Sequence, residues 1–242
     1  MTEFTGPIAL LGSGEYTPAM NETDRYLLSG QGTAPRVALI PAASGLEPGV
    51  PERWNAQGAE HFTALGAAVH PLGLITRDDA HDPQIVTELA QAALIYFSGG
   101  NPEYLVATLQ DTPAWSAIIA RHRAGSAIAG CSAGAMMLGS YTIRVRQVAA
   151  GLPPSWVSAL GVVPGLAVLP HFDRMAGFVG EEVFRAIVES APAEVTLVGI
   201  DEDTALVRVG AHQWRVMGRQ TVTVFGPGDE RLVYRPGDEL NL

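Results

Sequence analysis

The stretch Gly130-Cys131-Ser132-Ala133-Gly134 matches the G-x-S-x-G pattern of a sharp turn between a strand and a helix. A short apolar segment, Ser126–Ala129, precedes it, and small and apolar residues continue after it to Leu138. Such a turn raises a serine Oγ above the edge of a sheet and points the next backbone N–H at a developing oxyanion. Its glycines let the strand and helix backbones come close together. The stretch therefore predicts an α/β fold with a nucleophilic Ser132; the alternative is a glycine-rich turn with a buried serine.

Short apolar segments alternate with helical segments on both sides of this stretch, up to about residue 200. The expected strands are Ile8–Leu11, Arg36–Ile40, Ala68–Leu72, Leu94–Phe97, Ser126–Ala129 and Leu166–Leu169. The expected helices are Asn21–Leu28, Val50–Leu65, Pro83–Gln91, Pro102–Gln110, Pro113–Arg123 and Met175–Ser190. This alternation predicts right-handed βαβ units, and so a three-layer fold with a mostly parallel sheet covered by helices on both faces.

The pattern changes after residue 194, where strand-like segments follow one another with short turns between them. They are Val195–Ile200, Ala205–Val209, Gln213–Met217, Thr221–Phe225 and Arg231–Tyr234. They predict an antiparallel β meander that closes one edge of the sheet. Because the chain has no repeats, low-complexity tracts or linker, we expect one domain over residues 1–242.

The segment Tyr141–Pro164 shows little periodicity. Long loops in compact domains are often functional, so it is either a loop over the active site or an ordinary irregular connection.

The composition excludes several classes of protein and of binding partner. With 242 residues, 47% hydrophobic and 17% charged, the chain can bury a sizeable core. A net charge of −10 argues against nucleic acid or an anionic membrane as partner. No apolar run approaches the roughly 20 residues of a membrane helix, and Met1–Phe4 has no basic region of a signal peptide. A single cysteine, Cys131, excludes an internal disulfide, so we expect a cytoplasmic protein.

A serine nucleophile needs a base, and the base needs an acid that orients it. Among six histidines, His171 follows the apolar segment Leu166–Leu169, and catalytic residues of open α/β sheets gather at such strand ends. No Asp or Glu occurs from Thr112 through Phe172, and Asp173 is too near His171 in sequence to reach its ring easily. Asp201 and Glu202, after Val195–Ile200, remain as candidates for the acid.

A second junction, Phe97-Ser98-Gly99-Gly100-Asn101-Pro102, joins a predicted strand to a predicted helix. Glycine pairs let a backbone N–H face a ligand, so Gly100 is a candidate oxyanion donor beside the N–H of Ala133; a tight turn capped by Asn101 is the alternative. Gly12 and Gly14 begin a dinucleotide-binding pattern, but position 17 is threonine, which excludes NAD. No residues have the spacing of zinc ligands, so no metal or cofactor is expected.

Three arginines are candidates for binding a substrate carboxylate, which a guanidinium can hold through two hydrogen bonds. Arg144 and Arg146 lie in the stretch without carboxylates, and Arg174 follows His171 by three residues. The alternative for all three is an exposed surface position.

At these motifs the chain resembles the dipeptidase E and cyanophycinase family of serine peptidases. The resemblance rests on Phe97–Asn101, Gly130–Ala135, Pro170-His171-Phe172 and the G-I-D-E-D-T-A stretch Gly199–Ala205. It implies a class I glutamine-amidotransferase-like fold, a serine nucleophile at Ser132, a histidine base at His171 and, as in cyanophycinase-like members, an acid at Glu202. In dipeptidase E the acid lies soon after the serine, where this chain has no carboxylate.

The resemblance leaves the substrate open. Cyanophycinases have Asp-Gln before the histidine and several arginines after it, whereas here Leu169-Pro170 precede His171 and only Arg174 follows closely. The Gly-Gly-Asn at residues 99–101 is closer to dipeptidase E, which implies Asn101 as a substrate-binding residue and short peptides with acidic residues as substrates. The alternatives are another acyl hydrolase, namely an amidase, an esterase or a cyanophycinase-type enzyme, or a non-catalytic protein that binds a small molecule. A homodimer is left open.

Overall fold

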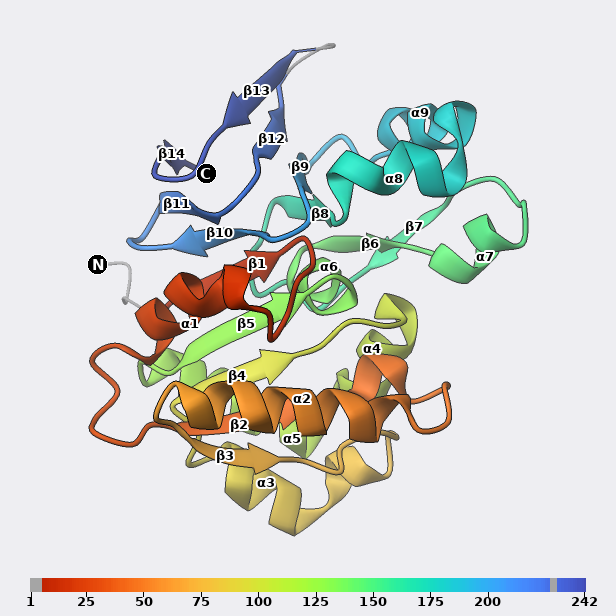
Figure 1. Cartoon of the computed structure of the whole chain (residues 1–242). Coiled ribbons are helices and arrows are strands. Elements are labelled where there is room, and N and C mark those ends of the chain that lie inside the picture. The colour runs from red at the N-terminus through yellow and green to blue at the C-terminus, as the bar shows by residue number, and fades with distance from the viewer. Residues whose placement is uncertain (1–5, 227–229) are drawn as a thin grey trace.

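The computed structural model describes residues 6–226 and 230–242, so the stretch Met1–Phe4 considered above lies outside the described residues. Its central sheet contains β1 (Ile8–Leu11), β2 (Arg36–Ile40), β3 (Ala68–Pro71), β4 (Leu94–Phe97), β5 (Ala127–Cys131), β10 (Thr204–Arg208), β11 (Gln213–Gly218) and β14 (Glu239–Asn241). The strand order is β14-β11-β10-β1-β5-β4-β2-β3 (Figure 1). From β1 to β3 neighbouring strands are parallel, whereas β10, β11 and β14 pair antiparallel. The predicted mostly parallel sheet is confirmed.

Helices cover both faces of this sheet, as predicted. One face packs against α1 (Asn21–Leu28) and α2 (Val50–Ala64), and the other against α3 (Pro83–Leu89), α4 (Pro102–Leu109), α5 (Pro113–Arg123) and α6 (Ala133–Leu138) (Figure 1). Successive residues of a strand point to opposite faces, so Leu39 packs in one core with Phe62, and Ile40 in the other with Ile118. In the described ranges, no helix combines the length and the apolar character that a membrane crossing requires.

A second sheet contains β8 (Leu166–Leu169), β9 (Thr196–Ile200), β12 (Val222–Phe225) and β13 (Arg231–Tyr234), in the order β13-β12-β9-β8. β8 and β9 are parallel, and the other pairs are antiparallel. The predicted C-terminal antiparallel strands are therefore present but divided between two sheets, and β14 was not predicted. The ends of β8 and β9 lie side by side, because Leu169 pairs with Gly199.

The predicted helix Met175–Ser190 is in fact two helices. They are α8 (Phe172–Val179) and α9 (Glu181–Glu189), and Gly180 between them has a φ of 87°, a conformation that a right-handed helix does not contain. α8 begins directly after His171, which itself has a φ of 49°. The left-handed backbone at His171 turns the chain from β8 into α8 at the edge of the second sheet.

The segment Tyr141–Pro164 contains a small hairpin and a short helix. β6 (Tyr141–Ile143) pairs antiparallel with β7 (Trp156–Ser158), and α7 (Val145–Ala149) lies between them. Side chains of α7 line two cavities next to the predicted active site. Of the two interpretations left open above, the structure therefore agrees with a segment placed at the active site.

Candidate active site

The turn at Ser132 has the geometry that its motif predicts. β5 ends at Cys131, α6 begins at Ala133, and Ser132 between them has a φ of 51° and a ψ of −111°. A positive φ is uncommon outside glycine and frequent at functional positions, where the surrounding structure holds it in place. The two glycines of the motif are needed for packing. A Cβ on Gly130 would lie 2.4 Å from the carbonyl carbon of Gly134, and a Cβ on Gly134 would lie 2.6 Å from the Phe97 carbonyl oxygen.

We expect Gly134→Ala to lower the free energy of unfolding by about 1–3 kcal/mol, the usual cost of forcing a methyl group into a packed site. The neighbour that it would meet is the backbone of β4, which cannot rotate away. Gly177→Ala is the matched control, because Gly177 is also helical and a Cβ there meets nothing within 4 Å. Urea denaturation of both variants tests this. Equal stability of the two would contradict the packing argument.

The structure brings Ser132, His171 and Glu202 together in one hydrogen-bonded chain. The His171 Nε2 lies 3.1 Å from the Ser132 Oγ, and the His171 Nδ1 lies 2.9 Å from a Glu202 carboxylate oxygen. Each distance is within the reach needed for proton transfer or for orienting the ring. The three residues come from the ends of β5, β8 and β9, which shows why residues separated by 39 and 31 positions meet.

Neither of the other two acids contacts the imidazole. Asp201 is buried, and its Oδ2 accepts hydrogen bonds from the backbone N–H and the hydroxyl of Thr221. Asp173 accepts a hydrogen bond from the backbone N–H of Glu202 at 2.8 Å. Asp201 therefore joins the end of β9 to the start of β12 (Val222–Phe225), whereas Asp173 holds the backbone of Glu202 in position.

Gly100 and Ala133 both lie close to Ser132. Gly100 lines the same two cavities as Ser132 and His171, and its φ is 146°. A Cβ at Gly100 would lie 2.4 Å from the Ala43 carbonyl group, and the neighbouring Asn101 N–H donates to that carbonyl oxygen at 2.7 Å. Ala133 is the first residue of α6, where backbone N–H groups have no partner within the helix. Their use as oxyanion donors stays a prediction.

Glu15 is a site residue that the sequence did not reveal. Its two carboxylate oxygens accept hydrogen bonds from the Gly99 N–H at 3.0 Å and from the Cys131 thiol at 2.9 Å. It thus links the loop after β4 to the residue before Ser132. The available signal was its position: Glu15 follows β1 closely, and β1 is the parallel neighbour of β5.

Cys131 is unsuited to act as the nucleophile. It is fully buried, and burial raises the pKa of its thiol well above the ordinary value, with the Glu15 carboxylate raising the pKa further. The protonated thiol is therefore favoured, and the thiolate is the reactive form of cysteine.

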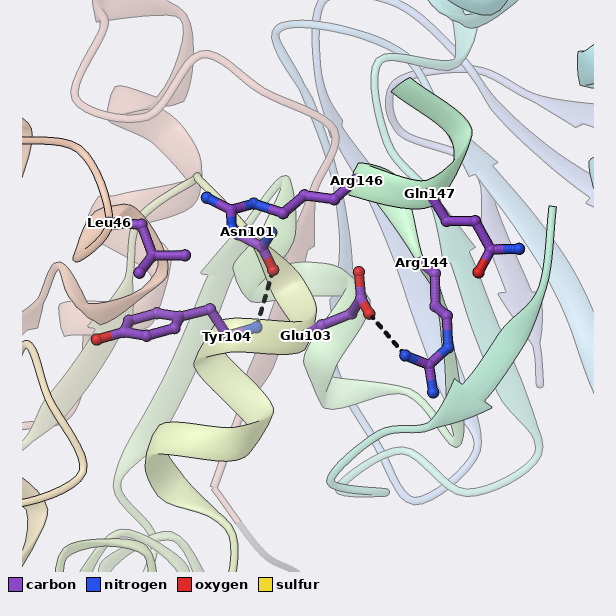
Figure 2. Close-up of a pocket in the computed structure, with 7 residues that line it drawn as sticks. All are labelled: Leu46, Asn101, Glu103, Tyr104, Arg144, Arg146 and Gln147. Atoms are coloured by element: carbon purple, nitrogen blue, oxygen red, sulfur yellow. Dashed lines mark hydrogen bonds and ion pairs between the residues drawn. The ribbon is translucent and has the colours of Figure 1, made fainter. Parts of the chain in front are cut away.

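The predicted substrate-binding arginines occupy two different places. Arg144, Arg146 and Asn101 line a cavity of about 370 Å³. Figure 2 shows these residues together. Arg144 forms an ion pair with Glu103 at 3.4 Å, and the Asn101 side chain caps α4 by accepting from the Tyr104 N–H. The carboxylate gap in the sequence thus did not leave Arg144 uncompensated, because Glu103 comes from an earlier segment.

Arg174 does not line this cavity and lies beside Glu202 and Asp173 instead. Its Nε is 3.6 Å from Glu202 and 3.6 Å from Asp173, and 63% of its side chain is exposed. The guanidinium therefore faces the carboxylates of Glu202 and Asp173. Among residues 6–226 and 230–242, no cluster of three His, Cys, Asp or Glu side chains has an arrangement that holds a metal ion.

Two further cavities share Ser132 and His171 as lining residues. One, of about 230 Å³, has a mixed lining that includes the charged residues Glu15, Glu47 and Arg53. The other, of about 570 Å³, is lined almost entirely by apolar side chains from α6, α7, α8 and α9. Ser132 therefore lies between a cavity with charged residues in its lining and an apolar one.

Comparison with known proteins agrees with this fold. The chain is 28% identical over 201 residues to a cyanophycinase of Nostoc sp. (strain PCC 7120), covering 79% of this chain and 63% of that protein. It is 30% identical over 207 residues to a cyanophycinase of Synechococcus elongatus, covering 80% and 62%. The chain thus spans less than two thirds of the length of these curated relatives.

Among solved structures, a peptidase from an acI-B1 Actinobacterium superposes with a TM-score of 0.89 at 32% identity, covering 99% of this chain and 98% of that one. A protein of Listeria monocytogenes EGD-e assigned to peptidase E has a TM-score of 0.63 at 20% identity, covering 89% and 99%, and shares the fold. The model of Peptidase family S51 matches residues 8–215. The resemblance to the dipeptidase E and cyanophycinase family is confirmed, and the chain belongs to Peptidase family S51.

Proposed function

We propose that this chain is a serine peptidase that hydrolyses short peptides through Ser132, His171 and Glu202. The observation that carries the proposal is the continuous contact from the Ser132 Oγ through both ring nitrogens of His171 to Glu202. Membership of a family of serine peptidases supports the reaction class.

In the acylation step, the Ser132 Oγ attacks the peptide carbonyl carbon while the His171 Nε2 takes its proton. The N–H groups of Gly100 and Ala133 stabilise the oxyanion of the tetrahedral intermediate. The imidazolium then gives the proton to the leaving amine, the C–N bond breaks, and an ester forms between the acyl group and Ser132.

In the deacylation step, His171 removes a proton from water, and the resulting hydroxide attacks the ester carbonyl. The C–O bond to Ser132 breaks, and the proton on His171 returns to the serine oxygen. Glu202 holds the tautomer in which the Nδ1 carries a proton, and stabilises the imidazolium in both steps. Residues of this chain and water account for every proton transfer.

A panel of dipeptides and the corresponding amides and esters, assayed by mass spectrometry, tests the proposal. A serine peptidase cleaves peptides, and Ser132→Ala does not. Cleavage of esters or simple amides alone would favour another acyl hydrolase. Absence of both turnover and labelling by a fluorophosphonate would favour a protein that binds small molecules.

We propose further that the substrate carries a carboxylate, from an acidic side chain or a free C-terminus, which Arg146 or Arg144 binds. The surroundings of Arg146 support a substrate carboxylate, since no described carboxylate of the chain lies within ion-pair distance of this arginine. Arg146→Ala is expected to lower kcat/KM by roughly ten- to a hundredfold on a free peptide, because a charge-assisted hydrogen bond contributes about 1.5–3 kcal/mol. For the amidated or Asp→Asn counterpart of the peptide, the same variant is expected to lower kcat/KM much less.

Arg144→Ala and Arg174→Ala provide the comparison. Arg144 already pairs with Glu103, so a smaller loss is expected, and Arg174 lies at Glu202, so its variant should change both peptides equally. If all three variants lower kcat/KM equally for both peptides, or if none of them lowers it for either peptide, the arginines do not recognise substrate charge.

A further inference from the structure

The apolar cavity that Ser132 and His171 line has a volume of about 570 Å³, whereas the other cavity that they share has about 230 Å³. Its apolar walls include Met136, Ile143, Val145, Val148, Met175 and Phe178, and Ser132 and His171 line it as well. Binding sites for small molecules commonly have this size and this character. A side chain in this cavity is therefore next to the reacting atoms.

One wall of this cavity is exposed to water. Phe178 is 67% exposed, and its ring centroid lies 6.0 Å from that of His171. Removing apolar surface from water is favourable, roughly in proportion to the area removed. A ligand with an apolar group gains this contribution, whereas a carboxylate in the same place loses its hydration without a partner.

α7 separates this cavity from the one that carries the arginines. Val145 and Val148 line the apolar cavity, whereas Arg146 and Gln147 line the other (Figure 2). Residues three apart lie on the same face of a helix, which explains the division. The site thus offers separate places for a charged and an apolar group.

From these observations we propose that the cavity binds a large apolar side chain, of the Phe, Leu or Met type, on one of the two residues that flank the scissile bond. The proposal rests on the peptidase function proposed above and specifies its substrate class. A carboxylate on the substrate then binds outside this cavity, on the arginine side of α7.

Two peptide series, X-Ala and Ala-X with X as Phe, Leu, Met, Ala or Asp, test the proposal by measurement of kcat/KM. At one of the two positions, peptides with Phe or Leu are expected to have a kcat/KM roughly ten- to a hundredfold higher than peptides with Ala or Asp. Burial of a large apolar side chain provides a discrimination of this size. No apolar preference at either position, or a preference for Asp at both, would overturn the proposal.

Val148→Asp tests the place of binding. It is expected to lower kcat/KM for the preferred apolar peptide at least tenfold and to change the Ala-Ala value by less than about threefold. Leu152→Asp is the matched control, because Leu152 follows α7, is 55% exposed and does not line the cavity. It is expected to leave both values unchanged. If Val148→Asp lowers kcat/KM equally for the apolar peptide and for Ala-Ala, the apolar side chain does not bind in this cavity.

Phe178→Ser on the exposed side of α8 repeats the test if Val148→Asp does not fold, as judged by its thermal melting. Labelling of Ser132 by a fluorophosphonate separates this proposal from the proposed function. Labelling without cleavage of any peptide would contradict the peptidase function. Labelling with cleavage but no apolar preference would contradict only the proposal for this cavity.

Discussion

Ser132→Ala is expected to lower kcat by about 10⁴- to 10⁶-fold, the usual cost of removing the nucleophile of a triad. The Ser132 Oγ lies 3.1 Å from the His171 Nε2. Among the described residues, no other nucleophilic side chain makes a hydrogen bond with this nitrogen. KM and the thermal midpoint are expected to change little, since alanine removes one oxygen atom. The measurements are turnover of the best peptide from the panel and labelling by a fluorophosphonate, which should be lost together.

Cys131→Ala is the control for this prediction, because Cys131 adjoins Ser132 in the same turn. The thiol is buried and donates to Glu15, so its removal leaves one carboxylate oxygen without this partner. Most of the activity and all of the labelling should remain, and Cys131→Ser keeps a donor for Glu15. If Cys131→Ala abolishes labelling while Ser132→Ala retains it, the assignment of the nucleophile is wrong.

The part of the fold that the sequence predicts is the part in which local signals are strong. Short apolar strands such as Arg36–Ile40, buried on both faces, leave little ambiguity about their position. Helices that begin with proline after a capping residue, as at Asn101 and Thr112, start where expected. The motif around Ser132 combines both kinds of signal, because an apolar strand ends and a helix begins within its five residues.

The parts that the sequence did not predict depend on contacts between distant residues. Nothing local to Leu166–Leu169 shows that β8 pairs with β9 in a second sheet. The partner of Arg144 is Glu103, 41 residues earlier, so a local absence of carboxylates was a poor guide to its environment. Glu15 is a further example, since its two donors come from β5 and from the loop after β4.

The choice between Asp201 and Glu202 shows the same limit at the site. Both follow the same apolar run, and composition does not separate them. The side chains of successive residues point in different directions, and here the first joins Thr221 while the second reaches His171. The family resemblance favoured Glu202, and the contact in the structure agrees.

Glu202→Gln is expected to lower kcat by about 10³- to 10⁴-fold, slightly less than the largest losses known for the acid of a triad. The Glu202 carboxylate accepts from the His171 Nδ1 at 2.9 Å, so the Nε2 is free to take the serine proton. A glutamine amide that donates to the Nδ1 favours the tautomer with its proton on the Nε2. That nitrogen then cannot accept the proton of Ser132, although the shape of the site is kept.

The matched control for this variant is Asp203→Asn. Asp203 is the next residue along the chain, contacts Arg219 rather than His171, and has a φ of 54° that asparagine tolerates. If Glu202→Gln keeps a KM and a thermal midpoint near those of the wild type, the substitution acts on the chemical step. The rate at which a fluorophosphonate labels this variant should then fall together with kcat. A kcat within tenfold of the wild-type value, or an equal loss in Asp203→Asn, would show that Glu202 does not orient His171. Because 28% of the Glu202 side chain is exposed, water can replace part of its contact with the imidazole, which is why the expected loss stays below that of Ser132→Ala.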